Sequence, residues 1–245
     1  MINKKSKLLL SFICVSACAY SYEKIKLGTS YGGWTIPSFL GRESVCYCVG
    51  AGEDISFDLA LVESFGCSVY IMDPTPRSLQ HFQYVKSMIR TGKPAYSQSG
   101  KSERYTITSS NIDKLQFLPI GLWTEDVKMR FFEPQNPSHV SHSIVNLQQT
   151  TNFFEADCKK LSTIMARLGH QYIDLLKMDI EGAEYTVIEN ILKEKISVKC
   201  LCAEFHSLPE ESKNQSLEKI IALLQCHGFE IFHRHGKDIT FFRRE

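Results

Sequence analysis

The chain reads IDLLKMDIEGAEYTVIENIL over residues 173–192, and this stretch decides the fold. It opens with a mostly apolar run that is typical of a buried strand, and from Tyr185 onward apolar residues recur on one helical face. The carboxylates of Asp179 and Glu181 and one glycine stand between the two patterns. Ligands of open α/β sheets bind where strands end and helices begin. The stretch therefore predicts a strand, an acidic loop and a helix, with both acids at a site.

These acids also have a simpler interpretation, because carboxylates near a helix N-terminus are stabilised by the helix dipole. That interpretation suits Glu184, at the start of the helical pattern, better than Asp179, which ends the strand. We take Asp179 as a candidate functional residue, Glu181 as an organiser of the loop and Glu184 as a helix-start charge.

The composition is that of one globular domain. The 245 residues are 43% hydrophobic and 22% charged, with a net charge of +1. These values leave apolar area to bury and carry no signature of disorder. Because no large excess of positive charge is present, we expect no nucleic-acid partner. No motif indicates an oligomeric state.

The first 19 residues differ from the rest. Three lysines precede an apolar run at residues 8–15 and then small residues, which is the layout of a secretory signal peptide. The sequence VSAC at residues 15–18 also resembles a bacterial lipoprotein box, which would leave Cys18 lipidated. Retention as a membrane anchor is a third interpretation, although the run is short for the roughly 20 residues that span a bilayer. We expect a secreted or membrane-anchored protein, with a cytoplasmic chain as the alternative.

Cysteine usage gives no sign of a metal site. Nine cysteines are present, two of them in the N-terminal segment, so the other seven cannot all pair within a monomer. Cys46 and Cys48, like Cys200 and Cys202, stand two apart in apolar runs and lack a partner cluster at zinc spacing. We interpret them as small core residues and predict no metal.

The organisation after the N-terminal segment is that of an α/β domain at residues 44–245, preceded by a lead-in at 20–43. Apolar runs at 45–49 and 68–72 are each followed by a helical pattern, which is the signature of βαβ units on a parallel sheet. Further patterns predict a strand over 114–122 and a helix over 158–168. The last two runs, 229–233 and 239–242, lie too close for a helical crossover and predict an antiparallel hairpin.

Residues 127–152 read as an insertion that forms a flap near the site, with a strand at 128–132 and a second at 143–147. Its histidines, His139 and His142, are expected to be solvated loop residues. The lead-in contains YGGW at residues 31–34, which is expected to pack as a lid or a strap.

A glycine-containing loop follows the first predicted strand. Gly50 and Gly52 allow backbone to approach a ligand where a Cβ would block it. Asp73 closes the second strand, where a carboxylate can accept hydrogen bonds from the ribose of an adenosine. The alternative for Asp73 is a turn that starts the next helix, since Pro74-Thr75-Pro76 follows.

The residues after this loop disfavour a dinucleotide. Ile55 stands where the dinucleotide fingerprint has its third glycine. Glu53 and Asp54 would repel a pyrophosphate, whereas they suit a sulfonium cofactor that carries an ammonium group. A nucleotide-sugar oxidoreductase is therefore disfavoured.

Four segments, in order and spacing, resemble the FkbM-type methyltransferase family. The resemblance covers roughly residues 45–243. It implies an α/β, Rossmann-like methyltransferase fold with a mostly parallel seven-stranded sheet and a C-terminal antiparallel hairpin, S-adenosyl-L-methionine as donor, and oxygen as the usual acceptor atom. The segments are VGAGEDISFDLAL continuing to FGCSVYIMDPTPRS (49–78), LPIGLW (118–123), DLLKMDIEGAEYTVIENIL (174–192) and CAEFH (202–206).

The resemblance also implies roles for individual residues. It places Gly50, Gly52 and Glu53 at the methionine end of the cofactor, Asp73 at the ribose, and Gly121 and Leu122 beside the adenine; Trp123 either stacks on the adenine or fills the core. Asp179 faces the methyl group and the acceptor, and Glu204 and His206 lie at the end of the fifth strand.

Methyl transfer from a sulfonium needs an aligned acceptor oxygen and a group that takes its proton. His206 is our first choice as general base, oriented by Asp179 or Glu204. An alternative for His206 is a helix-entry residue that bonds to backbone. Two carboxylates and a histidine can also hold a divalent cation, but nothing in their spacing requires one.

The sequence thus predicts an S-adenosylmethionine-dependent methyltransferase that acts on a hydroxyl. The alternative is an exported or membrane-anchored, non-catalytic methyltransferase-like binding protein. A small-molecule or glycan hydroxyl is the expected acceptor, but sugar, polyketide or lipid hydroxyls and protein side chains all stay open. Acceptor specificity is expected to lie in residues 20–42 and 127–152, and the N-terminal segment is expected to allow membrane association.

Overall fold

A computed structural model of the chain describes residues 22–136, 142–146, 148–207 and 216–244. The N-terminal segment and His139 lie outside these residues, so the expectations of a leader, a lipoprotein box or an anchor stay predictions. Within the part that is described, no helix is long and apolar enough to cross a membrane.

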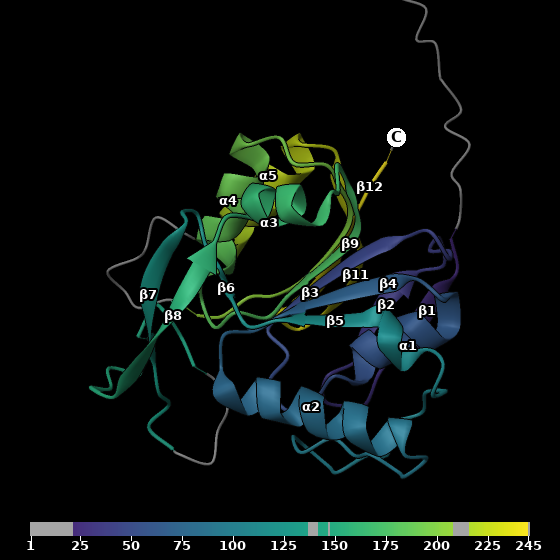
Figure 1. The fold of residues 1–245 in the computed structure, drawn as a ribbon. Helices are drawn as coiled ribbons and strands as arrows, with labels where there is room; N and C mark the ends of the chain where they lie inside the picture. The colour runs from purple at the N-terminus through teal and green to yellow at the C-terminus, as the bar shows by residue number, and fades with distance from the viewer. Residues whose placement is uncertain (1–21, 137–141, 147, 208–215, 245) are drawn as a thin grey trace, which may run out of the picture.

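A seven-stranded sheet forms the centre of the fold, in the order β11-β12-β10-β9-β3-β4-β5 (Figure 1). Five strands from β10 to β5 are parallel, and β12 runs antiparallel to both β10 and β11. The predictions of a mostly parallel seven-stranded sheet and a terminal antiparallel hairpin are therefore confirmed. The strands are β3 (Val45–Val49), β4 (Ser68–Met72), β5 (Leu115–Leu118), β9 (Ile173–Met178), β10 (Val198–Glu204), β11 (Phe229–His235) and β12 (Asp238–Arg243).

Helices cover both faces of this sheet (Figure 1). One face packs against α1 (Ser56–Phe65) and α2 (Pro76–Arg90), and the other against α3 (Leu161–Leu168), α4 (Glu184–Lys193) and α5 (Leu217–Cys226). Because successive side chains of a strand point to opposite faces, one strand contributes to both cores. In β3, Tyr47 joins the core under α3, α4 and α5, while Cys46 and Cys48 join the core under α1 and α2.

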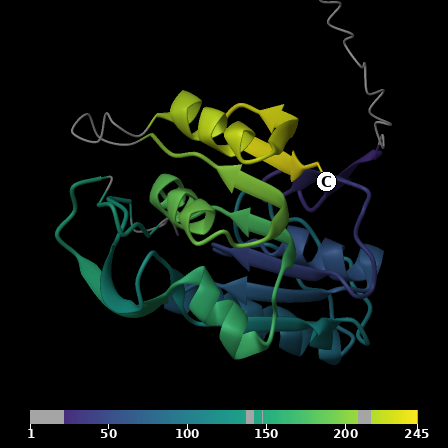
Figure 2. The same ribbon diagram turned by 90° about the horizontal axis from the view of Figure 1, so that it is seen from above.

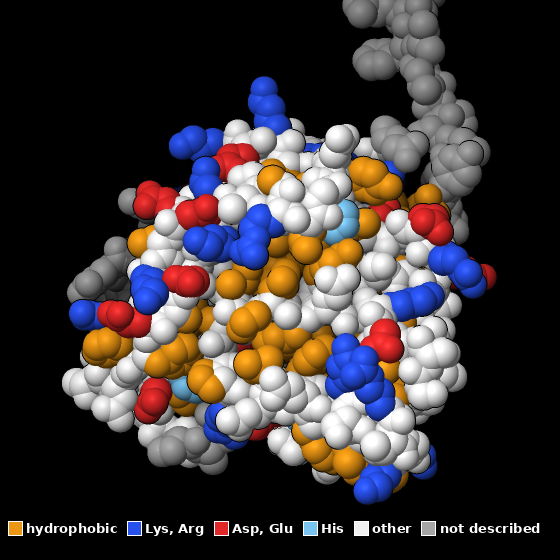
Figure 3. All heavy atoms as spheres, viewed as in Figure 1, with side chains coloured by type: hydrophobic (Ala, Val, Ile, Leu, Met, Phe, Trp, Pro, Cys, Tyr) orange, Lys and Arg blue, Asp and Glu red, His pale blue; other side chains and the backbone are white. Residues whose placement is uncertain are grey.

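The buried cysteines are small core residues, as predicted. Cys46, Cys48, Cys200 and Cys202 are all buried free thiols in the core beneath α1 and α2. On the face shown in Figure 3, lysines and arginines lie interspersed with acids and hydrophobic side chains and do not gather into one basic patch.

A second, smaller sheet corrects two sequence-based predictions. The run at 114–122 is not one strand, because β5 ends at Leu118 and β6 (Gly121–Leu122) belongs to a separate sheet of order β6-β8-β7. Residues 158 and 159 belong to β8 (Phe153–Lys159), so the helix predicted from Cys158 begins only at Leu161. The pairing of β8 with β7 (Val127–Phe132) is a contact between distant segments, which a local pattern does not report.

The flap contains one of its two predicted strands. Residues 128–132 lie in β7, as expected. Over 143–146 only an isolated bridge between Phe132 and Ser143 forms, and residue 147 lies outside the described residues. A single bridge gives too few backbone hydrogen bonds for a strand.

The lead-in is a β-hairpin that packs beside the C-terminal strand. β1 (Lys24–Leu27) pairs antiparallel with β2 (Trp34–Pro37). The Thr240 hydroxyl donates to the Thr35 carbonyl at 2.8 Å, and Figure 2 shows the purple lead-in next to the yellow end of the chain. The hairpin thus brings its turn, residues 28–33, to the carboxyl ends of the parallel strands.

The backbone at Gly50 packs directly against that of Asp179. The Gly50 nitrogen donates to Met72 at 2.9 Å, and the Asp179 nitrogen donates to Val49 at 3.0 Å, so β3 is joined to both of its neighbours. Gly50 has a φ of +81°, and a Cβ built there would lie 1.8 Å from the Asp179 carbonyl oxygen. Only glycine fits this position without moving the backbone.

We predict that Gly50→Ala lowers the free energy of unfolding by about 3 kcal/mol or more, because it combines a steric clash with a left-handed φ. Urea unfolding monitored by circular dichroism measures the change. Gly41→Ala is the control, since a Cβ at Gly41 meets nothing within 4 Å, and should change stability by less than about 0.5 kcal/mol. Equal stability of the two variants would contradict this interpretation of the strand ends.

Candidate functional site

A cavity of about 260 Å³ lies at the carboxyl ends of β3, β4, β9 and β10. The hairpin turn of the lead-in forms one wall, and Phe131, His142 and Ile144 of the flap region form another. The flap therefore lies at the site, as expected, but His142 faces the cavity and is half-buried instead of solvated. The predicted site residues that line the cavity are Gly50, Gly52, Glu53, Asp73, Gly121, Leu122, Asp179 and Glu204.

Two residues from the predicted set lie away from the cavity wall. His206 does not line the cavity, but its ring lies close to Asp179 and Glu181, which do. Trp123 packs against the core under α3, α4 and α5, which supports the second of its two predicted roles, the filling of the core.

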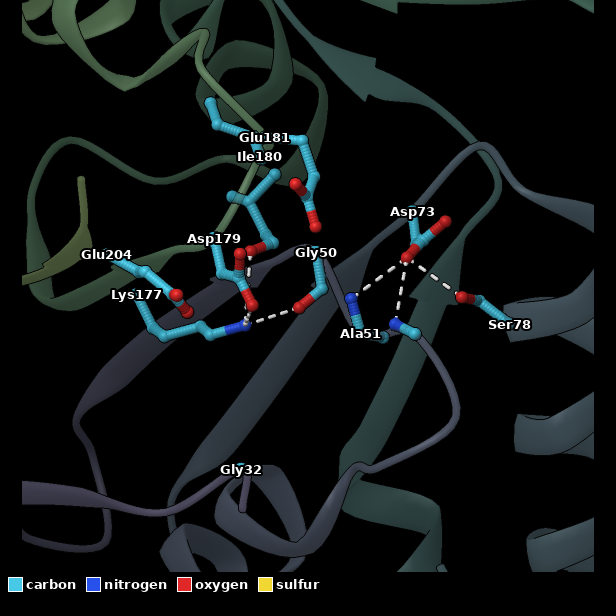
Figure 4. A network of polar contacts seen from close by, with 12 residues as sticks. Gly32, Gly50, Ala51, Asp73, Ser78, Lys177, Asp179, Ile180, Glu181 and Glu204 are labelled. Carbon is cyan, nitrogen blue, oxygen red and sulfur yellow. Dashed lines mark hydrogen bonds and ion pairs between the residues drawn. The ribbon is translucent and has the colours of Figure 1, made fainter. Parts of the chain in front are cut away.

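Asp73 is the centre of a hydrogen-bond network at the end of β4 (Figure 4). Its Oδ2 accepts from the Ala51 and Gly52 nitrogens at 2.9 and 3.1 Å and from the Ser78 hydroxyl at 2.8 Å. Its Oδ1 accepts from the nitrogen and the hydroxyl of Thr75 at 2.8 and 2.6 Å. Asp73 thus links the glycine loop to the N-terminus of α2.

These contacts show the turn-forming role of Asp73 that was the alternative to ribose binding. A carboxylate offers about four acceptor positions, and five donors already surround this one. Ribose binding would require the Thr75 and Ser78 hydroxyls to turn away, which both can do because a hydroxyl proton rotates freely. The ribose role of Asp73 stays a prediction.

Glu53 and Asp54 are fixed by neighbours. Arg77 of α2 forms a two-point contact with Glu53, at 3.2 and 2.9 Å. Asp54 accepts from the Thr29 hydroxyl at 2.6 Å and from the Ser56 nitrogen at 2.8 Å. The Asp54 contact ties the lead-in hairpin to the start of α1, so the cavity wall is held in place.

Lys177 lies beneath the acids as a buried cation. Its ammonium donates to the Gly50 carbonyl and lies 3.9 Å from Asp179 Oδ2 (Figure 4). Burial alone lowers the pKa of Lys177, but the carboxylates of Asp179 and Asp58 outweigh it, and the pKa is raised overall. Lys177 therefore carries a positive charge at neutral pH.

His206 is enclosed by carboxylates on two sides. Its Nδ1 lies 3.0 Å from Glu184, and its Nε2 lies 3.3 Å from Glu181, 3.8 Å from Glu204 and 4.0 Å from Asp179. Burial lowers the pKa of His206, but the hydrogen bond and charge of Glu184 and the charges of Glu181 and Asp179 raise it to about 9. At neutral pH the imidazole is therefore a cation.

Glu204, in contrast, is destabilised in its charged form by its surroundings. Burial, and then the negative charge of Asp179, raise its pKa to about 7. Its neighbour across the strand pair, Asp238, lines the same cavity, and burial followed by the charge of Asp179 raises its pKa as well. Glu204 thus exchanges a proton near physiological pH, which is the property required of a general base.

Asp179, Glu181 and His206 also bring three potential metal ligands together. One ligand atom from each lies within 4.8 Å of the others. Carboxylate oxygens and an imidazole suit several divalent ions. Our expectation of no metal stays a prediction.

Comparison with known proteins identifies the family. The model of the FkbM methyltransferase domain matches residues 50–231 of this chain. The chain belongs to the FkbM methyltransferase family.

Individual relatives are distant. The chain is 24% identical over 205 residues to the probable methyltransferase-like protein 24 of Rattus norvegicus, a match that covers 79% of this chain and 43% of the rat protein. It is 25% identical over 196 residues to methyltransferase 1 of Beauveria bassiana (strain ARSEF 2860), covering 69% of this chain and 75% of the fungal protein. The chain thus spans less than half of the rat relative. No solved structure matches it significantly.

Some residues of this FkbM-family site were not assigned from the sequence. Glu184 is fully buried and accepts from the Ile180 and Gly182 nitrogens, both at 2.9 Å, in addition to contacting His206. It organises the acidic loop and is more than a helix-start charge. Lys177 was also missed, although a lysine within the apolar run of a central strand is a visible signal. Glu181 has a φ of +54°, which fits its expected place in a tight loop.

We predict that His206 stabilises the fold in a pH-dependent way. Its pKa is about 9 in the folded state against 6.5 ordinarily, so its contribution is complete below pH 6.5 and is lost as pH rises through 9. The difference in unfolding free energy between the wild type and His206→Gln should therefore shrink by roughly 3 kcal/mol between pH 6 and pH 10.

Urea unfolding at both pH values measures this difference. His235→Gln is the control, because the His235 side chain is 89% exposed. A His206→Gln difference that is the same at both pH values would show that the four carboxylates do not hold the imidazole as described.

Proposed function

We propose that this protein is an S-adenosylmethionine-dependent methyltransferase that transfers a methyl group to a hydroxyl oxygen. The observation that carries the proposal is the charge of the cavity wall. Among the described lining residues, Lys177 is the one lysine or arginine, and it faces many acids. Those acids are Glu53, Asp54, Asp58, Asp73, Asp179, Glu181, Glu204 and Asp238.

These acidic side chains fit a cationic cofactor. S-adenosylmethionine carries a sulfonium and an ammonium group, and carboxylates stabilise both. A dinucleotide carries a pyrophosphate, which the same carboxylates would repel. The residues around the cavity therefore fit S-adenosylmethionine and disfavour NAD.

We assign the parts of the cofactor from the resemblance to the FkbM family, and the residues concerned all line the cavity. The loop of Gly50 and Gly52, with Glu53 beside it, would hold the methionine end, and Asp73 would hold the ribose. Gly121 and Leu122, which border the cavity at β6, would contact the adenine. When bound, the sulfonium supplies a methyl group on a good leaving group, so alignment supplies much of the rate enhancement.

The remaining task of the protein is to take a proton from the acceptor hydroxyl. Glu204 lines the cavity and has a pKa of about 7, so it is our choice of base. Asp179, held by Lys177, would orient the hydroxyl. His206, our first choice of base from the sequence, has a pKa of about 9 and is therefore protonated at neutral pH. We propose instead that its positive charge balances the charges of Glu181 and Asp179.

The alternative of a non-catalytic binding protein is less well supported. Raised pKa values at cavity carboxyls are typical of catalytic sites, since a binding shell has no need of a group that titrates near neutrality. Glu204 and the intact glycine loop therefore favour an enzyme.

We predict that isothermal titration calorimetry of the full chain detects binding of S-adenosylmethionine but not of NAD. Asp73→Ala should weaken S-adenosylmethionine binding about tenfold or more, and Asp73→Asn should weaken it less, because the amide retains some hydrogen bonds. Asp157→Ala, at an exposed acid, is the control. Binding of NAD, or unchanged binding by a folded Asp73→Ala, would contradict the proposal.

We also predict that one glutamate carboxyl titrates near pH 7. In ¹³C NMR of the chain with labelled glutamate, this signal should vanish in Glu204→Gln. Asp179→Asn should lower the pKa of Glu204, because it removes a negative charge that raises it. Methyl transfer should accordingly become faster as pH rises through about 7. A Glu204 signal that titrates near its ordinary value of 4.5 would contradict this assignment.

A further inference from the structure

Tyr31 is a large aromatic side chain at the mouth of the cavity that the proposed chemistry does not use. It lies in the turn of the lead-in hairpin, is 62% exposed, and lines the cavity. A single exposed aromatic ring is ordinary on a protein surface, but a ring that lines a cavity can pack against whatever enters it. Tyr31 is therefore placed to contact a ligand.

The Tyr31 side chain packs against the backbone of Gly100. A Cβ built on Gly100 would lie 2.8 Å from Tyr31 Cβ and 2.9 Å from Cγ, so the side chain rests directly on the Gly100 backbone. The neighbouring Ser30 donates its hydroxyl to Glu103 at 2.8 Å. These contacts fasten the turn to the loop at residues 97–104. Tyr31 thus presents a pre-positioned ring, which lowers the entropic cost of binding.

Tyr31 lines the same cavity as the acids Asp179, Glu181 and Glu204. Burial, and then the charges of Asp179, Glu204 and Glu181, raise the pKa of its phenol. In Figure 4 Asp179, at the end of β9, and Glu204, at the end of β10, lie beside Lys177 and away from Asp73, and Glu181 lies between them and Asp73. Asp238 adds a fourth carboxylate to the same wall. This part of the cavity is the acceptor side if Asp73 marks the cofactor side.

The chemistry of this wall excludes several acceptor classes. A phosphate or carboxylate on the acceptor would face four acids, whose charge Lys177 and His206 offset only in part, and would be repelled. An alkyl chain would cover these carboxylates without replacing their hydrogen bonds to water, which is costly. An amine would be bound as ammonium, but the carboxylates would stabilise its protonated form and keep its lone pair from reacting.

A neutral polyol meets each requirement. Ionised carboxylates only accept hydrogen bonds, and a sugar offers several hydroxyl donors at once. The C–H face of a sugar ring can pack on the face of an aromatic ring. Resting on the proposed transferase function, we propose that the acceptor is a neutral carbohydrate whose ring packs on Tyr31 and whose hydroxyls donate to Asp179, Glu204 and Asp238.

A glycan array tests this proposal. The full chain, labelled with a fluorophore, is applied with and without S-adenosylhomocysteine to an array of neutral, phosphorylated, carboxylated and amine-bearing glycans. Neutral glycans should retain it. Tyr31→Ala should weaken retention about tenfold, equivalent to about 1.4 kcal/mol, and Tyr31→Phe should largely preserve it because the ring face remains.

Tyr172→Ala is the matched control. Tyr172 is 54% exposed and lies at the amino end of β9, whereas the cavity lies at the carboxyl ends of the strands. Its loss should therefore leave retention unchanged. Unchanged melting temperatures and S-adenosylmethionine affinities would show that the Tyr31 variants are intact. Retention of only charged glycans, of no neutral glycan, or equal retention of Tyr31→Ala and wild type would overturn the proposal.

Calorimetry with S-adenosylmethionine separates the two proposals. If the cofactor binds but no neutral glycan is retained, the carbohydrate inference fails and the transferase function stands. If neutral glycans bind through Tyr31 but the cofactor does not bind, the transferase function fails, and Tyr31 marks a carbohydrate-binding site of another kind.

Discussion

The site of this protein depends on one buried ammonium group, that of Lys177. A lysine in the central strand of a sheet is costly, because the charge loses its hydration. Here the charge is kept, since Asp179 and Asp58 lie near it and the backbone carbonyls of residues 49 and 50 accept hydrogen bonds from it. The same ammonium therefore joins β9 to β3 and compensates part of the negative charge of the cavity. Without it, the acids at the strand ends would repel one another more strongly.

The remaining negative charge explains the unequal behaviour of the two titratable groups beside Asp179. The carboxylates around His206 stabilise its charged form, so it stays protonated at neutral pH. Glu204 is destabilised as an anion and titrates near neutrality. Judged by ordinary pKa values alone, the histidine is the expected base. The environment reverses that expectation, because the buried Glu184 carboxylate holds the imidazole, whereas burial and then the charge of Asp179 raise the pKa of Glu204.

The parts of the fold that sequence could predict are those set by local patterns. Central strands such as β3 and β9 are mostly apolar and buried, and the short link between β11 and β12 requires a hairpin. The parts that it missed depend on distant contacts. β8 forms because it pairs with β7, and the function of Glu184 depends on a histidine 22 positions away. The position of Asp73 at the end of β4 was predictable. Whether its carboxylate can bind a ribose depends on the orientation of the Thr75 and Ser78 hydroxyls, which no sequence pattern reports.

Two segments outside the central sheet complete the cavity, and both come from regions where acceptor specificity was expected. The lead-in contributes Tyr31 and the flap contributes His142, so the cavity wall combines the ends of the central strands with two segments that those strands do not determine. A crystal structure of the full chain with S-adenosylhomocysteine tests most directly whether the strand ends form a methyl-donor site. The ribose should lie at Asp73 and the sulfur should face Asp179 and Glu204. Adenosine bound elsewhere, or a sulfur that points away from these two acids, would contradict the proposed site.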